Sequence, residues 1–226
     1  MSAVSVFDIL GPVMIGPSSS HTAGAARLGK VARAVADGEI CEVTFYLHGS
    51  FAKTYKGHGT DRALVAGILG MEPDDKRLRD ALNIAKEENV SISFIEMDLG
   101  EVHPNTVKFV IRTRDNRKTE VTGSSIGGGM IEISEVNDNK VEFTGNYPTL
   151  ILTHKDVPGI VSKVTGILYD GDINIAFMKV FRSKRGYMAT MIFEVDHEID
   201  KTTLECIKNI DSVEKVILIH AVGDER

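Results

Sequence analysis

The 226-residue sequence contains only two cysteines, Cys41 and Cys206, which lie far apart in the chain. Two thiols cannot build a disulfide framework or a four-thiolate metal site. Each falls in a segment with apolar periodicity, so we expect both to be small core residues. The seven histidines contain no close pair at metal-ligand spacing, with His48 and His58 ten residues apart. The sequence therefore predicts no metal site formed by this chain alone.

Long apolar runs and basic blocks are also lacking. No segment approaches the roughly 20 apolar residues that a membrane-spanning helix needs, and the N-terminus does not read as a secretory signal. The formal net charge is −6 and the pI is about 5.7. An acidic balance without lysine and arginine clusters argues against a nucleic-acid partner. We expect a globular, cytoplasmic protein with no membrane association.

The sequence predicts an α+β protein whose first domain, residues 1–146, is a mixed α/β domain with a largely antiparallel sheet. Its first helix carries Leu28, Val31 and Val35 on one face and ends at Gly38. A second helix runs from Thr60 to Gly70 and a third over 75–88. Strands are predicted at 40–47, 90–96, 107–113, 119–125, 130–135 and 141–144.

A second domain, residues 147–226, has the element order βαββαβ of a ferredoxin-like unit. Apolar alternation, turn residues and helical spacing define its elements. We expect strands at 149–154, 173–182, 187–195 and 213–220, with helices at 159–169 and 201–209.

Residues 16–24, GPSSSHTAG, place hydroxyls and a histidine directly before an amphipathic helix. A helix start offers free N–H groups and a partial positive charge, so such residues can cradle a carboxylate or a phosphate. Candidate contacts are Ser18, Ser19, Ser20 and Thr22, with His21 beside them. The alternative is that Ser20 or Thr22 only caps the helix.

Residues 48–62 form a second polar stretch, predicted as a segment between a strand and a helix. His58 lies just before the predicted helix start, whose positive end favours a neutral imidazole able to accept a proton. Asp61 would orient that ring or oppose the helix effect. Alternatively, His58 is an ordinary loop residue.

Two further segments suggest the same kind of site. The polar turn 103–106, HPNT, enters a strand, and residues 123–129 are glycine-rich. Gly127–Gly129 predicts either an anion-binding nest or a wide β-bulge followed by a hairpin. Neither a P-loop nor a GxGxxG unit is present, which disfavours nucleotide binding.

The motifs at 16–24, 49–61, 103–106 and 125–129 together resemble the beta chain of bacterial iron–sulfur L-serine dehydratases. The resemblance spans essentially the whole chain. It implies a lyase that converts L-serine, a small amino acid, to pyruvate and ammonia and is active only with an alpha subunit, which carries the cysteines of a [4Fe–4S] cluster. It also implies that residues 1–146 are similar in fold to the allosteric substrate-binding domain of some D-3-phosphoglycerate dehydrogenases.

The resemblance also implies roles for the candidate residues. Residues 18–22 would hold the substrate carboxylate, and His58 or His21 would handle protons. Asp61 would orient an imidazole or meet the substrate ammonium, while Lys53 and Thr60 would make secondary contacts. The competing hypothesis is a non-catalytic regulatory module that senses serine or a related anion for a partner enzyme.

Residues 147–226 resemble the ACT family of amino-acid-sensing domains, on the loop 154–159 and the turn 173–175. In that family an amino acid binds at a dimer interface. The matching positions imply effector contacts at His154, Asp156, Gly159 and Asn174. An ACT domain used only to form a homodimer is the alternative.

Overall fold

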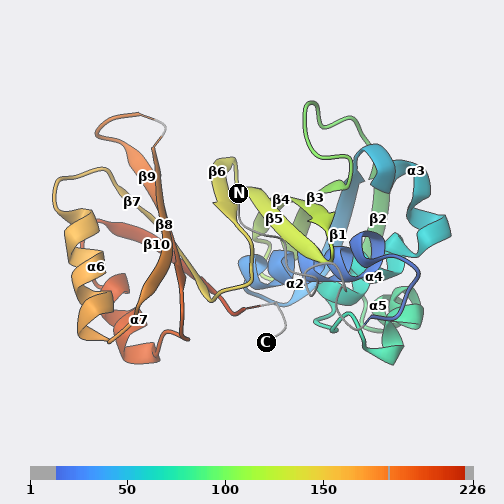
Figure 1. The fold of residues 1–226 in the computed structure, drawn as a ribbon, viewed down its shortest axis with the longest axis horizontal. Helices are drawn as coiled ribbons and strands as arrows, with labels where there is room; N and C mark the ends of the chain where they lie inside the picture. The colour runs from blue at the N-terminus through green and yellow to red at the C-terminus, as the bar shows by residue number, and fades with distance from the viewer. Residues whose placement is uncertain (1–13, 183, 222–226) are drawn as a thin grey trace. The chain divides into compact units, whose positions relative to one another are not determined.

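The computed structural model describes residues 14–182 and 184–221. The chain is organised as two compact units, with the division between Asp138 and Asn139. Both units mix helices and strands, and the second has a four-stranded sheet of its own (Figure 1). The α+β class is therefore confirmed, while the predicted boundary after residue 146 stays a prediction.

The first unit is built on a sheet in which β1 pairs in parallel with β2 and the other neighbours are antiparallel, in the order β2-β1-β3-β4-β5. On β1 the side chains of Val43, Phe45 and Leu47 are fully buried, and the residues between them are half-buried. This alternation is typical of a sheet with one face in the core. The strands are β1 (Ile40–Leu47), β2 (Ser91–Glu96), β3 (Thr106–Thr113), β4 (Lys118–Gly127) and β5 (Met130–Val136).

Two helices of the first unit, α2 (Ala25–Ala36) and α4 (Thr60–Ile68), pack side by side against the sheet (Figure 1). Their backbones meet at two glycines. A Cβ added to Gly29 would lie 2.5 Å from the carbonyl oxygen of Leu64, and one added to Gly67 would lie 2.1 Å from that of Ala26. Only glycine permits this approach, which brings the N-termini of both helices close to the polar motifs.

Several predicted segments of this unit differ in the structure. Residues 16–24 do not precede the helix as a turn, because Ser19–Gly24 form a π-helix, η1, that continues directly into α2. The stretch predicted as a loop contains a helix, α3 (Gly49–His58), followed at once by α4. The predicted helix 75–88 is divided into a 3-10 turn, η2 (Lys76–Asp80), and α5 (Ala81–Glu87).

The glycine-rich segment 123–129 contains a β-bulge and a hairpin turn, which was the structural alternative to an anion-binding nest. The register between β4 and β5 shifts between Ser125 and Gly127, and Gly127, Gly128 and Gly129 all have positive φ. The remaining strand predictions for this unit agree with the structure to within one or two residues.

The second unit begins with β6 (Asn139–Phe143) and has a sheet in the order β10-β7-β9-β8, all pairs antiparallel. Two helices cover one face of this sheet (Figure 1), and the core between them includes Leu152, Val164 and Phe193. The ferredoxin-like prediction is confirmed. The elements are β7 (Thr149–Lys155), α6 (Ile160–Asp170), β8 (Ile175–Arg182), β9 (Met188–Val195), α7 (Lys201–Lys208) and β10 (Val213–Ile219).

The prediction for the cysteines was wrong. Cys41 on β1 is half-buried and Cys206 on α7 is exposed. Neither cysteine lies on the buried face of its element. On β1 that face carries side chains such as Val43, and on α7 it carries Ile207.

Candidate active site

His21 is the centre of a hydrogen-bonded cluster formed by η1 and α3. Its Nε2 lies 3.1 Å from Thr54 Oγ1 and 3.3 Å from Ser50 Oγ, while its Nδ1 lies 3.4 Å from Ser18 Oγ. Thr54 donates its proton to the carbonyl oxygen of Ser50 at 2.8 Å, so toward His21 it can only accept. We therefore assign the proton of the neutral ring to Nε2, which leaves Nδ1 as an acceptor facing Ser18.

The charge state of His21 follows from its surroundings. The ring is 9% exposed and meets the ring of His58 edge to face, with 4.8 Å between centroids. Burial lowers the pKa of His21 below 6.5, and the nearby charge of His58 lowers it further. His21 is therefore a neutral imidazole at pH 7.

His58 lies at the junction of two helices rather than simply before one. It is the last residue of α3, and Gly59 takes the left-handed conformation at φ 72° that allows α4 to start immediately. The predicted position therefore needs correction. His58 lies at the C-terminal, negatively polarised end of α3 as well as next to the N-terminal, positively polarised end of α4. Its exposed ring carries no hydrogen bond within the described part of the chain, and it is free to meet a ligand.

A cavity of about 240 Å³ lies beside His58, and we call it the His58 cavity. Thr22 contributes to its wall, and the Thr22 hydroxyl is buried without a hydrogen-bond partner among the described residues. The other wall residues are 15–17, 56–59, Arg62, Leu78 and Arg79. The cavity thus joins the motif at 16–24 to the end of α3 and the start of α4.

The segment 103–106 supports α3 from outside the cavity. The carbonyl oxygen of Pro104 accepts the N–H groups of Ser50 at 2.8 Å and Phe51 at 3.4 Å, which satisfies two donors at the start of the helix. Gly49, at φ 56°, is needed there because a Cβ would lie 2.6 Å from the same oxygen. The carbonyl oxygen of Asn105 in turn accepts the N–H of Ser125, whose side chain packs against Gly24 of η1.

The structure brings several predicted site residues together and leaves others apart. Ser18, His21, Thr22 and His58 form one cluster, and Ser18 rather than Ser20 is the helix cap, accepting the His21 N–H at 3.3 Å. The remaining predicted residues have varied surroundings. Ser19 and Ser20 are half-buried in η1, Lys53 is exposed on α3, Thr60 is buried with an unpartnered hydroxyl, and the Asp61 carboxylate accepts the Arg62 N–H.

Ser50 and Thr54 were missed as site residues, although they lie within one of the polar motifs. The signal was their spacing. Residues four apart share a helix face, and Phe51 and Tyr55 repeat the same spacing with aromatic side chains. Arg79 was missed because it comes from η2, which no motif includes.

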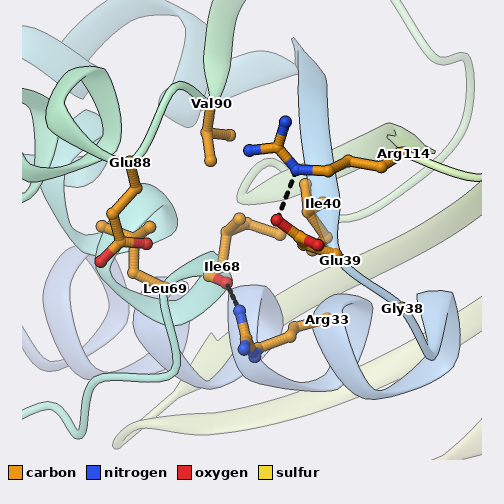
Figure 2. Close-up of a pocket in the computed structure, with 9 residues that line it drawn as sticks. All are labelled: Arg33, Gly38, Glu39, Ile40, Ile68, Leu69, Glu88, Val90 and Arg114. Carbon is orange, nitrogen blue, oxygen red and sulfur yellow. Dashed lines mark hydrogen bonds and ion pairs between the residues drawn. The ribbon is translucent and has the colours of Figure 1, made fainter.

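A second cavity, of about 290 Å³, lies at the far ends of α2 and α4 (Figure 2). Its two arginines already have partners. Arg114 pairs with Glu39, and Arg33 Nη1 donates to the carbonyl oxygen of Ile68 at 2.8 Å. Because the carboxylate of Glu88 also lies in the wall, this cavity is poorly suited to an anion.

Comparison with known proteins identifies the family. The family model of the serine dehydratase beta chain matches residues 5–136, and that of the ACT domain matches residues 149–212. The sequence is 44% identical over 215 residues to a Bacillus subtilis (strain 168) protein named "Probable L-serine dehydratase, beta chain", covering 95% of this chain and 97% of that one. The chain belongs to the serine dehydratase beta chain family.

Other relatives of this beta-chain family member include a second beta chain and a longer dehydrogenase. An L-serine dehydratase beta chain of Peptoniphilus asaccharolyticus is 40% identical over 212 residues and is covered to 96% of its length. A D-3-phosphoglycerate dehydrogenase of Methanocaldococcus jannaschii is 30% identical over 198 residues, which are only 37% of that protein. The predicted similarity of the first domain to a domain of such dehydrogenases is thus supported.

Neither a metal site nor a membrane helix is evident in the described residues of this family member. Within residues 14–182 and 184–221, no three side chains of His, Cys, Asp or Glu come together as a possible metal site. The same part of the chain contains no helix with the length and apolar character needed to cross a membrane.

The four positions predicted to bind an effector in the ACT domain do not form one cluster. His154 is buried on β7, and its Nε2 has no partner among the residues that the structure describes. Asp156 accepts the Gly186 N–H at 2.9 Å and pairs with Arg182. Gly159 starts α6. Asn174 precedes β8, which runs parallel to β7, so it lies at the opposite end of the sheet from His154.

Proposed function

We propose that this chain is the beta subunit of an L-serine dehydratase, which converts L-serine to pyruvate and ammonia together with an alpha subunit in the cytoplasm. The observation that carries the proposal is the pairing of His21 and His58, whose ring centroids are 4.8 Å apart, with His58 in the wall of the cavity. The reaction removes the α-proton and the β-hydroxyl of serine as water. The resulting aminoacrylate tautomerises to an imine, which water hydrolyses to pyruvate and ammonia.

The geometry supports different roles for the two histidines. Both ring nitrogens of His21 face hydroxyl groups, whereas the exposed ring of His58 lines the cavity. We assign proton transfer at the substrate α-carbon to His58. His21 is then a positioning residue, whose neutral ring packs edge to face on His58 and limits its orientation.

The substrate carboxylate is assigned to the wall that contains Thr22. The Thr22 hydroxyl is buried and has no partner within residues 14–182 and 184–221, so a carboxylate oxygen would satisfy it. Ser18 serves the same site indirectly through Nδ1 of His21. Lys53 and Thr60 remain proposed secondary contacts, and Asp61 remains proposed to orient an imidazole or to meet the substrate ammonium. Ser19 and Ser20 belong to the proposed carboxylate cradle.

A [4Fe–4S] cluster does not fit this chain. A cluster of this kind is held by four cysteine thiolates, and the two thiols here lie on β1 and α7, in different units. We propose that the alpha subunit holds the cluster.

The test is anaerobic reconstitution of this chain with its alpha subunit and a pyruvate assay with L-serine. We expect pyruvate from the pair and none from either chain alone. In the pair, His58→Asn should abolish turnover, whereas His197→Asn, an exposed histidine in the second unit, should not. Turnover retained by the His58→Asn pair would exclude His58 as the proton-transferring residue.

A regulatory module is the second candidate, favoured by one observation. The chain also matches 37% of the length of a D-3-phosphoglycerate dehydrogenase, a protein that is not named a dehydratase. If this chain only senses an anion, His58→Asn should leave both ligand binding and the partner's activity unchanged.

We also propose a homodimer through the ACT domain. The edge strand β8 exposes Phe177, Met178 and Val180. Because His154 and Asn174 lie at opposite ends of one sheet, an effector site that used both would need His154 from one copy of the chain and Asn174 from a second copy. Val180→Lys should convert the dimer to a monomer in light scattering. If L-serine binds this domain, the same change should also weaken that binding, whereas an unchanged mass would contradict the proposal.

A further inference from the structure

The His58 cavity is lined by three cationic side chains, Lys56, Arg62 and Arg79. All three are exposed, and within the described residues none forms an ion pair. No acidic side chain belongs to the described wall of the cavity. The carboxylates of Asp61 and Asp80 are not part of that wall; Asp61 accepts the Arg62 N–H and Asp80 accepts from Asn83. These bonds leave both carboxylates charged, but the wall itself has three cationic side chains and no anionic one.

The start of α4 adds to this positive character. Gly59 is the N-cap of this nine-residue helix and provides no side-chain cap. The Arg62 N–H in the first turn is bonded to Asp61, so the N–H groups of Thr60 and Asp61 are the ones left without a side-chain cap. The helix dipole places partial positive charge at the same end. Independently, Thr22 belongs to the cavity wall and is only 1% exposed, and its hydroxyl has no hydrogen-bond partner in the part of the chain that the structure describes.

These features distinguish small carboxylic acids that carry an ammonium group from those that do not. A carboxylate gains from the cations, the helix start and the hydroxyl, whereas the ammonium group of an amino acid finds no acidic side chain on the described wall. In the second cavity, by contrast, Arg114 is neutralised by Glu39 (Figure 2). The His58 cavity therefore favours net negative ligands over zwitterions.

We infer that the His58 cavity of this chain binds small carboxylates that lack an ammonium group, such as α-keto acids, in preference to L-serine. This inference rests on the proposed function and deepens it, since the keto acid is then the product of the same site. The acceptor for the serine ammonium would come from the partner subunit. Product would consequently compete with substrate, most strongly when the partner is absent.

The experiment is a calorimetric titration of the full chain, without its partner, at low ionic strength. The probes are pyruvate, L-serine and inorganic phosphate. We compare the unaltered chain with Arg79→Gln, and with Arg77→Gln as a matched control. Arg77 lies on the same 3-10 turn but pairs with Asp75 and is not part of the cavity wall.

We expect pyruvate to bind at least about tenfold more tightly than L-serine. Arg79→Gln should weaken pyruvate binding several-fold, and Arg77→Gln should not. Equal or tighter binding of L-serine, binding of phosphate alone, no binding in the millimolar range, or an Arg79→Gln chain that binds pyruvate normally would each overturn the inference. Thermal unfolding of both variants checks that the fold is retained.

The activity of the reconstituted pair separates this inference from the proposed function. An active pair whose isolated beta chain shows no preference for pyruvate would overturn only the inference. A chain that prefers pyruvate but supports no turnover with the alpha subunit would overturn only the assignment as a dehydratase subunit.

Discussion

His21 has hydroxyl groups at both ring nitrogens, and this arrangement sets its tautomer. The direction of the bond at Nε2 is determined by Thr54, because the Thr54 proton is committed to the Ser50 carbonyl oxygen. Nδ1 is then free to accept from Ser18. A single threonine in α3 thus determines which nitrogen of a buried ring carries the proton.

Replacing Thr54 by valine removes this acceptor without changing the side-chain volume much. We expect about a tenfold loss of kcat in the reconstituted pair, the effect of one hydrogen bond, and a mixture of His21 tautomers in ¹⁵N NMR spectra. Thr54→Ser should restore both. Thr165→Val, which removes a similar bond to the carbonyl of Val161 on α6, serves as the control and should leave the NMR signals of His21 unchanged.

The lowered pKa of His21 predicts a pH dependence of stability. Below about pH 6.5 the unfolded chain binds a proton at His21 more readily than the folded chain, because burial and then His58 lower the folded pKa. Stability should therefore fall as the pH drops from 6.5 toward that lower pKa. In urea unfolding at a series of pH values, His21→Gln should flatten this decline, and an unchanged slope would contradict the assignment.

At the scale of elements, the crossing of α2 and α4 brings the two halves of the site together. Gly29 and Gly67 allow the helices to touch along their backbones, and each helix begins at one of the polar motifs. The contact between α2 and α4 at Gly29 and Gly67 thus positions the polar groups of the site, although no polar side chain of the site takes part in that contact.

Gly67→Ala tests this crossing. Alanine favours helix formation by up to about 1 kcal/mol over glycine, but the new Cβ would lie 2.1 Å from the Ala26 carbonyl oxygen. We expect a net loss of about 1–3 kcal/mol in the free energy of unfolding. The same change at Gly166 of α6, where a Cβ has no atom within 4 Å, should be neutral or stabilising in the same denaturation assay.

Helix α3 was the main element that sequence reasoning missed, and the reason is physical. Gly49 and Gly57 weaken its intrinsic helix propensity, and only Phe51 of its ten residues is buried. Its first turn is completed by Pro104, more than forty residues away in the sequence, and its side chains bond to His21. By contrast, β1 and α2 have strong periodic patterns and were predicted correctly, except that Asp37 rather than Gly38 takes the left-handed conformation that ends α2.

At the scale of the whole molecule, residues 139–146 determine where a separable ACT fragment should begin. Thr144 donates through its N–H and its hydroxyl to Glu194, a residue that is only 6% exposed, and Glu142 pairs with Lys179. A fragment that starts at residue 147 would leave Glu194 without these donors.

We therefore expect residues 139–226 to be more stable than residues 147–226 by about 1–3 kcal/mol, the cost of leaving a buried acceptor unpaired. Chemical denaturation of the two fragments provides the comparison. Glu194→Gln should narrow the difference, because an amide costs less to bury unpaired than a carboxylate does. Equal stability would instead support the predicted boundary after residue 146.

The sequence by itself determined the two-part α+β organisation, the ferredoxin-like order and the polar motifs, because these depend on local periodicity and residue type. Only the tertiary structure decided that His21 is buried and His58 exposed, that Thr54 sets the tautomer, and that Arg79 reaches the same cavity. These contacts join residues distant in the chain. The packing of η1, α3, α4 and η2 against one another, rather than any local pattern, places them together.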